Sequence, residues 1–193
     1  MGKLIIAMGR QFDTGGHLVG EKIAERLGLK FYDGEMIDDI AKKGGLENYE
    51  YTGVPAPNHS FKGHYEWMPT QEEFEAHCKV IKDLAERGNC VICGRCADWL
   101  LRDDPNCVRV FIRADFDYRV QRFIKAYNIT DVEGIEDRYK VLDEGRAAYY
   151  KHFTGREWGQ LDDFNLVIDT TVCGPQRADE ILYAYLKLCN LAE

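Results

Sequence analysis

The alternation of short apolar runs with longer amphipathic segments constrains this fold more than any other feature of the chain. Five runs have the length, apolar content and Gly, Asp or Asn boundaries of buried strands: residues 3–8, 30–32, 90–93, 108–112 and 165–168. The remaining segments include stretches with the helical spacing of apolar residues: 17–27, 35–43, 71–87, 117–126, 135–150 and 176–191. Because helical crossovers join parallel strands, this pattern predicts an α/β three-layer sandwich with a five-stranded parallel sheet.

The length and composition of the chain are those of one globular domain. It has 193 residues, of which 45% are apolar and 30% are charged. This apolar share is enough for a sizeable core, and it excludes a disordered chain or a collagen-like fibre. At a typical size of roughly 150 residues per domain, we expect residues 1–193 to form a single domain with an insertion.

Negative charge dominates the chain. The 25 Lys and Arg residues against 33 Asp and Glu residues give a formal net charge of −8, so no general basic field is present to hold nucleic acid or an anionic membrane. The apolar run at residues 4–8 is too short for a signal-peptide core or a membrane span. We therefore expect a cytoplasmic protein without nucleic-acid or membrane partners, in which any anionic ligand needs a local cationic site. A homo-oligomer is compatible with the sequence.

Residues 44–69 interrupt the alternation of strands and helices. The segment contains three of the five prolines, two histidines and several aromatic residues without clear periodicity. A long irregular segment inside a compact domain is typically either functional or poorly ordered. We interpret it as a mobile insertion whose aromatic side chains either wrap a ligand or pack beneath the loop.

The first predicted strand leads through a glycine-containing turn into the first predicted helix. In this order, small residues let the backbone approach a phosphate, and the N–H groups of the turn and the helix start attract its charge. The P-loop motif G-x-x-x-x-G-K-[ST] fits only in part, because Arg10 stands at its first glycine, Gly16 at its lysine and His17 at its hydroxyl residue. We expect a phosphate against the backbone of Thr14, Gly15 and Gly16. The alternative is a turn that packs helix against strand without a ligand.

Four segments together resemble the cytidylate kinase-like family of bacterial proteins. They read GRQFDTGGH at 9–17, FYD at 31–33, CVICGRCAD at 90–98 and DEGRAAYYKHFTGREWG at 143–159. The resemblance spans nearly the whole chain and implies the P-loop NTPase fold of nucleoside monophosphate kinases, with a lid-like region at 127–160.

The same resemblance implies ATP and Mg²⁺ as cofactors. It implies phosphoryl transfer from ATP to a nucleoside monophosphate such as CMP, or to a related small-molecule phosphate acceptor. The alternative is a nucleotide-binding protein without transferase activity, because the missing lysine removes a positive charge that bridges the donor phosphates.

Two turns at the expected ligand edge of the sheet carry candidate contacts. For the glycine turn we assign phosphate or nucleotide contacts to Arg10, Gln11, Thr14, Gly15, Gly16 and His17. Arg95 follows the third strand at the carboxyl edge, where open parallel sheets bind ligands. In cytidylate kinases the arginine of this turn grips the acceptor phosphate; here Cys96 replaces the following Asp, and Asp98 is the nearest carboxylate. The alternative for Arg95 is a surface arginine that caps a loop.

Two further arginines follow the fourth strand. Arg119 and Arg122 share one face of the predicted helix at 117–126. In nucleoside monophosphate kinases this helix leads toward the lid, so both residues are candidates for contacting donor phosphates when the lid closes. The alternative is a solvated helix face paired with Asp115 and Asp117, an interpretation that we favour for Arg119.

The predicted helix at 135–150 carries the remaining candidates. Cytidylate kinases have an Arg, an Asp and an Arg on the lid-proximal helix, and Asp143 and Arg146 match the spacing of the last two. Arg138 stands five residues before Asp143 instead of four, and Lys140 is a substitute. The resemblance makes Arg138, Asp143 and Arg146 catalytic and Lys140 a phosphate contact, with cations neutralising the transferring phosphoryl group and Asp143 orienting Arg146 or the acceptor. The alternative is a surface ion pair one helical turn apart.

Other polar residues have simpler interpretations. Cys90, Cys93 and Cys96 have the spacing of a metal half-site, but residues three apart on a strand point to opposite faces, so we expect no metal there. The seven cysteines are expected to be reduced thiols. His17 either touches a phosphate or lies in solvent at the helix start. For Asp33 we favour an N-cap over a contact with magnesium or a ribose.

Overall fold

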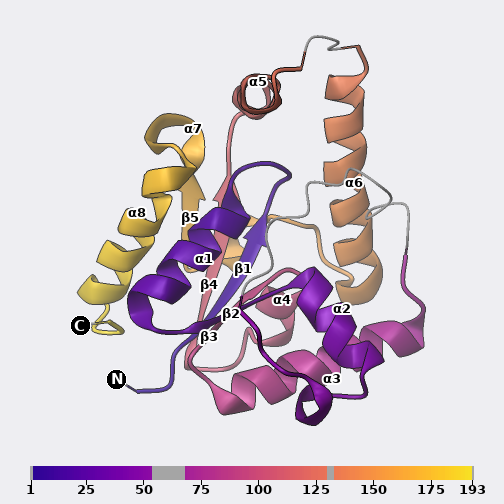
Figure 1. Cartoon of the computed structure of the whole chain (residues 1–193), viewed down its shortest axis with the longest axis vertical. Helices are drawn as coiled ribbons and strands as arrows, with labels where there is room; N and C mark the ends of the chain where they lie inside the picture. Colours follow the sequence, from indigo (N-terminus) through magenta and orange to yellow (C-terminus); the bar gives the residue numbers. More distant parts are fainter. Residues whose placement is uncertain (1, 54–67, 130–132, 193) are drawn as a thin grey trace.

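The computed structural model describes residues 2–53, 68–129 and 133–192. Its centre is a sheet of five strands, β1 (Ile5–Arg10), β2 (Lys30–Asp33), β3 (Cys90–Cys93), β4 (Cys107–Arg113) and β5 (Leu166–Asp169). The strands are parallel and follow the order β2-β3-β1-β4-β5. The predicted five-stranded parallel sheet is therefore confirmed (Figure 1).

Helices cover both faces of this sheet. On one face, α1 (Gly16–Leu27) and α8 (Pro175–Leu188) pack on a core that includes Ile6 and Met8 of β1. On the other face, α2 (Gly34–Lys42), α3 (Gln71–Arg87) and the short α4 (Ala97–Leu100) pack on a core that includes Ile5 and Ala7. Successive residues of β1 thus serve opposite layers, as strand geometry requires, and the three-layer sandwich is confirmed.

The helix α5 (Phe116–Tyr127) lies beyond the end of the sheet, and the long helix α6 (Ile135–Thr154) extends from the level of α5 down toward α2 (Figure 1). A small cluster joins them to the glycine turn, because Phe12 packs against buried side chains of both helices: Val120, Phe123 and Tyr139. Helix α6 extends past residue 150, where the prediction ended. Its last turn stacks Phe153 on Phe74 of α3 at 4.1 Å between ring centroids, and Gly155 ends the helix in the left-handed conformation.

Local capping explains where several helices begin. Asp33 accepts a hydrogen bond from the Met36 backbone N–H at 2.9 Å, so its interpretation as the N-cap of α2 is confirmed. Thr70 and Glu73 form a capping box at the start of α3. Two one-turn helices were not predicted: α4, and α7 (Thr170–Cys173), which directly follows β5.

The expected insertion at 44–69 is described only at its two ends, and residues 54–67 lie outside the described part of the chain. In the first part, a 3₁₀ turn at Leu46–Asn48 buries Leu46. The rings of Tyr49 and Tyr51 pack against the same core as α2 and α3. Tyr49 and Tyr51 therefore contribute to this core, whereas the other aromatic residues of the segment lie outside the described part of the chain.

The thiols lie where strand geometry predicts. Cys90 belongs to the core beneath α2 and α3, whereas Cys93 belongs to the core beneath α1 and α8. All seven cysteines are free, and within residues 2–53, 68–129 and 133–192 no group of three or more His, Cys, Asp or Glu side chains is arranged to hold a metal ion. No helix among the described residues is both long and apolar enough to cross a membrane.

Candidate active site

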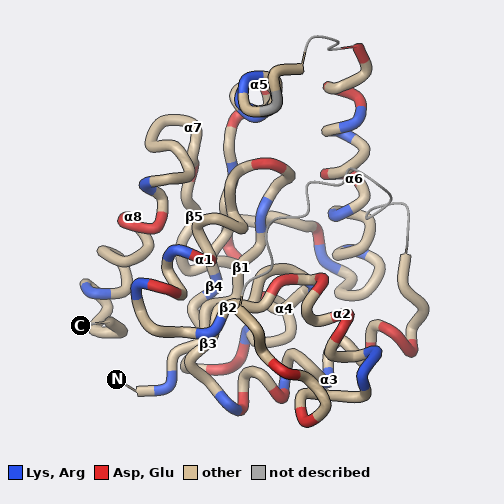
Figure 2. The backbone as a smooth tube through the Cα atoms, in the orientation of Figure 1, with Lys and Arg blue, Asp and Glu red and all other residues tan. Residues whose placement is uncertain are grey.

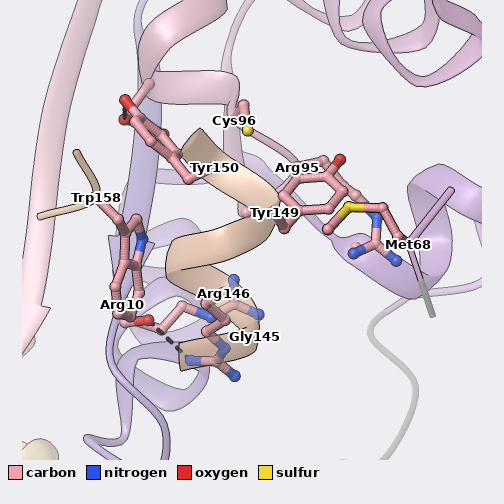
Figure 3. A pocket seen from close by; sticks show the side chains of 13 residues that line it. Arg10, Met68, Arg95, Cys96, Gly145, Arg146, Tyr149, Tyr150 and Trp158 are labelled. Atoms are coloured by element: carbon pink, nitrogen blue, oxygen red, sulfur yellow. Dashed lines mark hydrogen bonds between the residues drawn. The ribbon is translucent and has the colours of Figure 1, made fainter. Parts of the chain in front are cut away.

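A pocket opens at the carboxyl ends of β1 and β3, next to α6 (Figure 3). From β1 the chain passes to β2 and β3 on one side of the sheet and then to β4 and β5 on the other, so the order of the strands reverses beside the pocket. Open parallel sheets bind ligands at such a reversal. The lining residues are Gly9, Arg10, Gly34, Met68, Gly94, Arg95, Cys96, Asp98, Gly145, Arg146, Tyr149, Tyr150 and Trp158.

The glycine turn connects the end of β1 to the start of α1. Gly15 has φ 79°, a left-handed conformation that glycine adopts without strain, and a Cβ there would lie 2.2 Å from the Cβ of Pro175. As at the start of every α-helix, the first N–H groups of α1 have no acceptors inside their own helix. The backbone at Thr14, Gly15 and Gly16 therefore has the form of an anion-binding turn.

Internal hydrogen bonds fix the shape of this turn. Thr14 is buried, and its hydroxyl donates to the carbonyl of Gln11 at 3.1 Å. The Gln11 side chain accepts from the Ala114 N–H at 3.1 Å, just after β4. The buried Thr170 hydroxyl donates to the Thr14 carbonyl at 2.9 Å. The side chains of Gln11 and Thr14 are thus engaged in holding the turn.

Side chains of helices α5 and α6 form hydrogen bonds to the same turn. Asp143 accepts from the Phe12 N–H at 2.7 Å, and it also accepts from Arg119 at 2.7 Å. Arg119 donates in addition to the Phe12 carbonyl at 2.8 Å and is only 3% exposed. The solvated helix face that we favoured for Arg119 is therefore wrong, because the ion-pair partner lies on α6 and not on the neighbouring turn of its own helix. The role of Asp143 in orienting Arg146 or an acceptor stays a prediction.

Asp13, at the tip of the turn, is a second point of attachment. Its carboxylate accepts from Arg122 and, at 2.9 Å, from the hydroxyl of Tyr139. Arg122 also donates to the Asp13 carbonyl at 2.6 Å. Burial, reinforced by the Asp13 charge and hydrogen bond, raises the pKa of the Tyr139 hydroxyl far above its usual value, which keeps it a donor. Arg119 and Arg122 are thus brought together at the glycine turn, and their contacts with donor phosphates stay a prediction.

Arg10 and Arg146 meet in the pocket. Arg146 donates from Nη1 to the Arg10 carbonyl at 2.8 Å, drawn as the dashed line in Figure 3. The Arg146 guanidinium also lies over the Phe12 ring at 5.6 Å. These contacts join the middle of α6 to the first residues of the glycine turn. Two cationic groups from distant parts of the sequence therefore face one cavity.

Asp33 and His17 occupy the space beside this cation pair. His17 Nε2 lies 3.1 Å from the Asp33 carboxylate, so His17 takes part in a contact and does not merely face solvent. Burial disfavours ionisation of Asp33, but hydrogen bonds from His17 and Met36, together with the charge of Arg10, hold its pKa below the usual value. An ionised carboxylate therefore stands next to the start of α1.

Arg95 lines the pocket beside Gly34 and is held by residues that the sequence reasoning missed. Its guanidinium binds the Asp38 carboxylate through two hydrogen bonds, with Nε to Oδ1 at 2.8 Å. His77 Nε2 lies 3.1 Å from the same carboxylate, and the Tyr149 ring lies 6.0 Å from the guanidinium. Burial lowers the pKa of His77, so the imidazole is neutral near pH 7. Arg95 is a positioned group and not a loose surface arginine.

Asp98 and a tyrosine of α6 both line the pocket. It is 5% exposed and accepts from the Tyr150 hydroxyl at 2.7 Å. Burial raises the pKa of Asp98 above its usual value, although the hydrogen bond from Tyr150 opposes this effect. Cys96, at the position where cytidylate kinases have an aspartate, is buried and has its pKa raised by burial.

Arg138 and Lys140 lie outside this lining. Both are exposed, and Lys140 lies 3.6 Å from Asp137 on the same helix, along which basic and acidic residues are interspersed (Figure 2). Arg138 precedes Arg146 by eight residues, which corresponds to about 12 Å along the axis of an α-helix. Their assignments as catalytic and phosphate-binding residues stay predictions.

Residues missed by the sequence reasoning include Asp13, Asp38 and Tyr139. Asp13 offered a signal, because an acidic residue in the middle of an anion-binding turn needs a cationic or hydrogen-bonding partner. Asp38 and Tyr139 lie on helix faces with ordinary patterns, and nothing in their spacing reveals their partners.

Comparisons with known proteins identify the family of this chain. The profile described as "Cytidylate kinase-like family" matches residues 5–172. A cytidylate kinase from Sulfurisphaera tokodaii is 24% identical over 188 residues, which cover 95% of each chain. A cytidylate kinase from Pyrococcus horikoshii is 24% identical over 193 residues, which cover 94% of this chain and 88% of that one.

Solved structures show the same architecture. A protein from Eubacterium ventriosum is similar with a TM-score of 0.75 and 26% identity, over 96% of this chain and 99% of that chain. A shikimate kinase from Bacteroides thetaiotaomicron is similar with a TM-score of 0.57 and 13% identity, over 96% and 99% of the two chains, and shows the P-loop kinase fold. Because the family profile covers most of the sequence, this chain belongs to the cytidylate kinase-like family.

Proposed function

We propose that the protein is an ATP-dependent kinase that transfers a phosphoryl group to a nucleoside monophosphate such as CMP, or to a related small molecule. The observation that carries this proposal is the convergence of Arg10, Arg95 and Arg146 on one pocket beside an anion-binding turn. Phosphoryl transfer asks a protein mainly for positioning and for charge that neutralises the moving group. Family membership supports a kinase of nucleotides or small molecules.

The two sides of the pocket suit the two substrates. On the donor side, the backbone of Thr14, Gly15 and Gly16 would hold ATP phosphates, with Arg119 and Arg122 supporting the turn from outside. On the acceptor side, Arg95 would bind the phosphate of the acceptor. Arg146, between them, would face the transferring phosphoryl group, where charge develops in the transition state.

Mg²⁺ would enter with the nucleotide. The donor set suits such an ion, because Mg²⁺ takes one or two carboxylates together with substrate phosphates and water, and the ionised Asp33 stands beside the start of α1. His17, at the hydroxyl position of the motif, is held at Asp33 and would orient that carboxylate. When bound, the ion neutralises charge on the β- and γ-phosphates.

A transfer assay tests the proposal directly. Purified protein is incubated with MgATP and, separately, with CMP, dCMP, UMP, AMP and GMP, and ADP formation and the phosphorylated product are followed by chromatography. We expect turnover with at least one monophosphate, with CMP the first candidate. If no nucleotide is phosphorylated, shikimate and gluconate are tested as acceptors without a phosphate. Absence of transfer to these acceptors as well would contradict the transferase proposal.

The second candidate is a nucleotide-binding protein without transferase activity. The observation that favours it is Gly16 at the position of the P-loop lysine, because that lysine bridges donor phosphates in P-loop enzymes. The same samples separate the two functions. Binding of MgATP in calorimetry without any ADP formation supports the second candidate, whereas turnover excludes it.

A further inference from the structure

Among the positions at which the glycine turn differs from the P-loop motif, Arg10 and Gly16 are neighbours in the fold. The motif has glycine where this chain has Arg10, and lysine where it has Gly16. A Cβ added to Gly16 would lie 2.7 Å from the Cβ and 3.0 Å from the Cγ of Arg10. A longer side chain at position 16 and the aliphatic stem of Arg10 therefore compete for the same space.

The side chain of Arg10 extends from the end of β1 along the start of α1, with its aliphatic stem next to Gly16. Its Nη1 lies 2.5 Å from the place of a Cβ at Gly94, so the guanidinium reaches the turn after β3. In Figure 3, Arg10 lies next to Arg146, whose Nη1 donates to the Arg10 carbonyl at 2.8 Å. The guanidinium thus lies in the pocket between the donor turn and the acceptor turn.

We propose that Arg10 supplies the cation that the P-loop lysine supplies elsewhere, so that donor phosphates are held between its guanidinium and the backbone of Thr14, Gly15 and Gly16. This inference deepens the proposed function and rests on it. An arginine suits the task, because its planar fork donates to two phosphate oxygens at once, whereas lysine offers a single point charge. In this arrangement the positive charge comes from a side chain at the end of β1 and not from the start of α1. Position 16 is a glycine because the aliphatic stem of Arg10 occupies the space that a larger side chain would need.

The decisive test exchanges the two positions. Arg10→Gly removes the charge and the stem, and we expect it to lower kcat and the affinity for MgADP by about 10²-fold. Gly16→Lys in the presence of Arg10 overpacks the turn and is expected to lower the melting temperature. The double variant Arg10→Gly/Gly16→Lys restores the motif, and we expect it to recover activity to within about tenfold of the wild type.

Two further variants keep the test independent of folding. Arg10→Gln retains the start of the stem, and with it the contact to Gly16, but lacks the charge. It should lose phosphate affinity while its melting temperature stays near that of the wild type. Arg102→Ala makes the same change of charge at an exposed arginine that stacks on Trp99, outside the pocket lining, and should leave both binding and activity unchanged.

Calorimetry with inorganic tripolyphosphate measures phosphate binding directly and tests the inference without any transfer reaction. We expect binding by the wild type, its loss in Arg10→Gln, and its return in the double variant. Equal binding by Arg10→Gln and the wild type would overturn the inference, as would a folded double variant that binds no better than Arg10→Gly, or a wild type that does not bind at all. Arg10-dependent binding without transfer to any acceptor supports the inference and contradicts the proposed kinase.

Discussion

The two turns that frame the pocket differ in how many elements hold them. The glycine turn is held by several: the Phe12 N–H and carbonyl and the Asp13 and Thr14 carbonyls bind side chains of other elements, and the Asp13 carboxylate binds Arg122 and Tyr139. The turn after β3 is joined to β1 by a hydrogen bond from the Gly94 N–H to the Met8 carbonyl at 3.0 Å, and its Arg95 guanidinium binds Asp38.

This difference predicts where each side of the pocket is vulnerable. The conformation of the glycine turn depends on residues of several distant elements, so damage there should affect stability and the chemical step together. The orientation of the Arg95 guanidinium depends on Asp38, so damage there should affect binding of one substrate. The following predictions test this contrast.

Arg146→Ala should have the largest effect. Arg146 joins α6 to the Arg10 carbonyl and faces the expected path of the phosphoryl group. Loss of an arginine in this role lowers kcat by about 10³-fold, which corresponds to roughly 4 kcal/mol. Initial rates with saturating MgATP and acceptor measure it. Lys151→Ala, at an exposed cation of the same helix, is the matched control and should remain active. Full activity of Arg146→Ala would show that α6 does not contribute to the donor side.

Asp143→Asn should destabilise the fold. The variant leaves the buried Arg119 without its anionic partner, and breaking such a buried pair costs about 3 kcal/mol. Urea unfolding measures the free energy of unfolding. Asp137→Asn removes an exposed carboxylate of the same helix and should leave that free energy nearly unchanged. If both variants unfold alike, α5 and α6 do not hold the glycine turn through this pair.

Asp38→Asn should act on the acceptor and much less on the donor. An amide cannot accept both hydrogen bonds of the Arg95 fork, so the guanidinium loses its fixed orientation. We expect the KM for the acceptor to rise about tenfold, with a smaller change in kcat and in the KM for ATP. Steady-state kinetics with each substrate varied measures this split. Asp39→Asn, at an exposed neighbour paired with Lys43, is the control. Equal changes in both KM values would contradict the division into two sides.

Asp98→Asn should have the smallest effect and a distinctive pH dependence. The pKa of Asp98 is raised by burial, so the folded chain binds this proton more tightly than the unfolded chain does. The resulting stability is fully present below the unfolded pKa and is lost as the pH rises through the folded value. An asparagine still accepts from Tyr150 and cannot ionise, so we expect a higher melting temperature than wild type at pH 7.5 and a smaller difference at pH 4. A difference that grows toward low pH would contradict this assignment.

Much of the fold could be predicted, because the signals that define strands and helices are local. The five strands, their parallel arrangement and the six longer helices follow from apolar spacing and from the residues at the turns. Helix α6 was predicted too short because Phe153 gains its partner, Phe74, only in the folded chain. The one-turn helices α4 and α7 carry too few residues for a periodic pattern.

In the candidate site, too, local relations could be predicted from the sequence and long-range contacts could not. By itself the sequence determined that a glycine-containing turn joins β1 to α1, that Arg95 follows β3 and that Asp143 and Arg146 share a helix, because these relations are local in the sequence. Only the tertiary structure decided which groups meet, since Asp143 binds Phe12 across 131 positions and Arg95 binds Asp38 across 57. Only the fold shows that Arg10 and Gly16 are neighbours, because in the sequence they look like two unrelated differences from the P-loop motif. A Cβ added to Gly16 would lie 2.7 Å from the Arg10 Cβ, and this proximity depends on how β1 packs against α1, which spacing along the chain does not reveal.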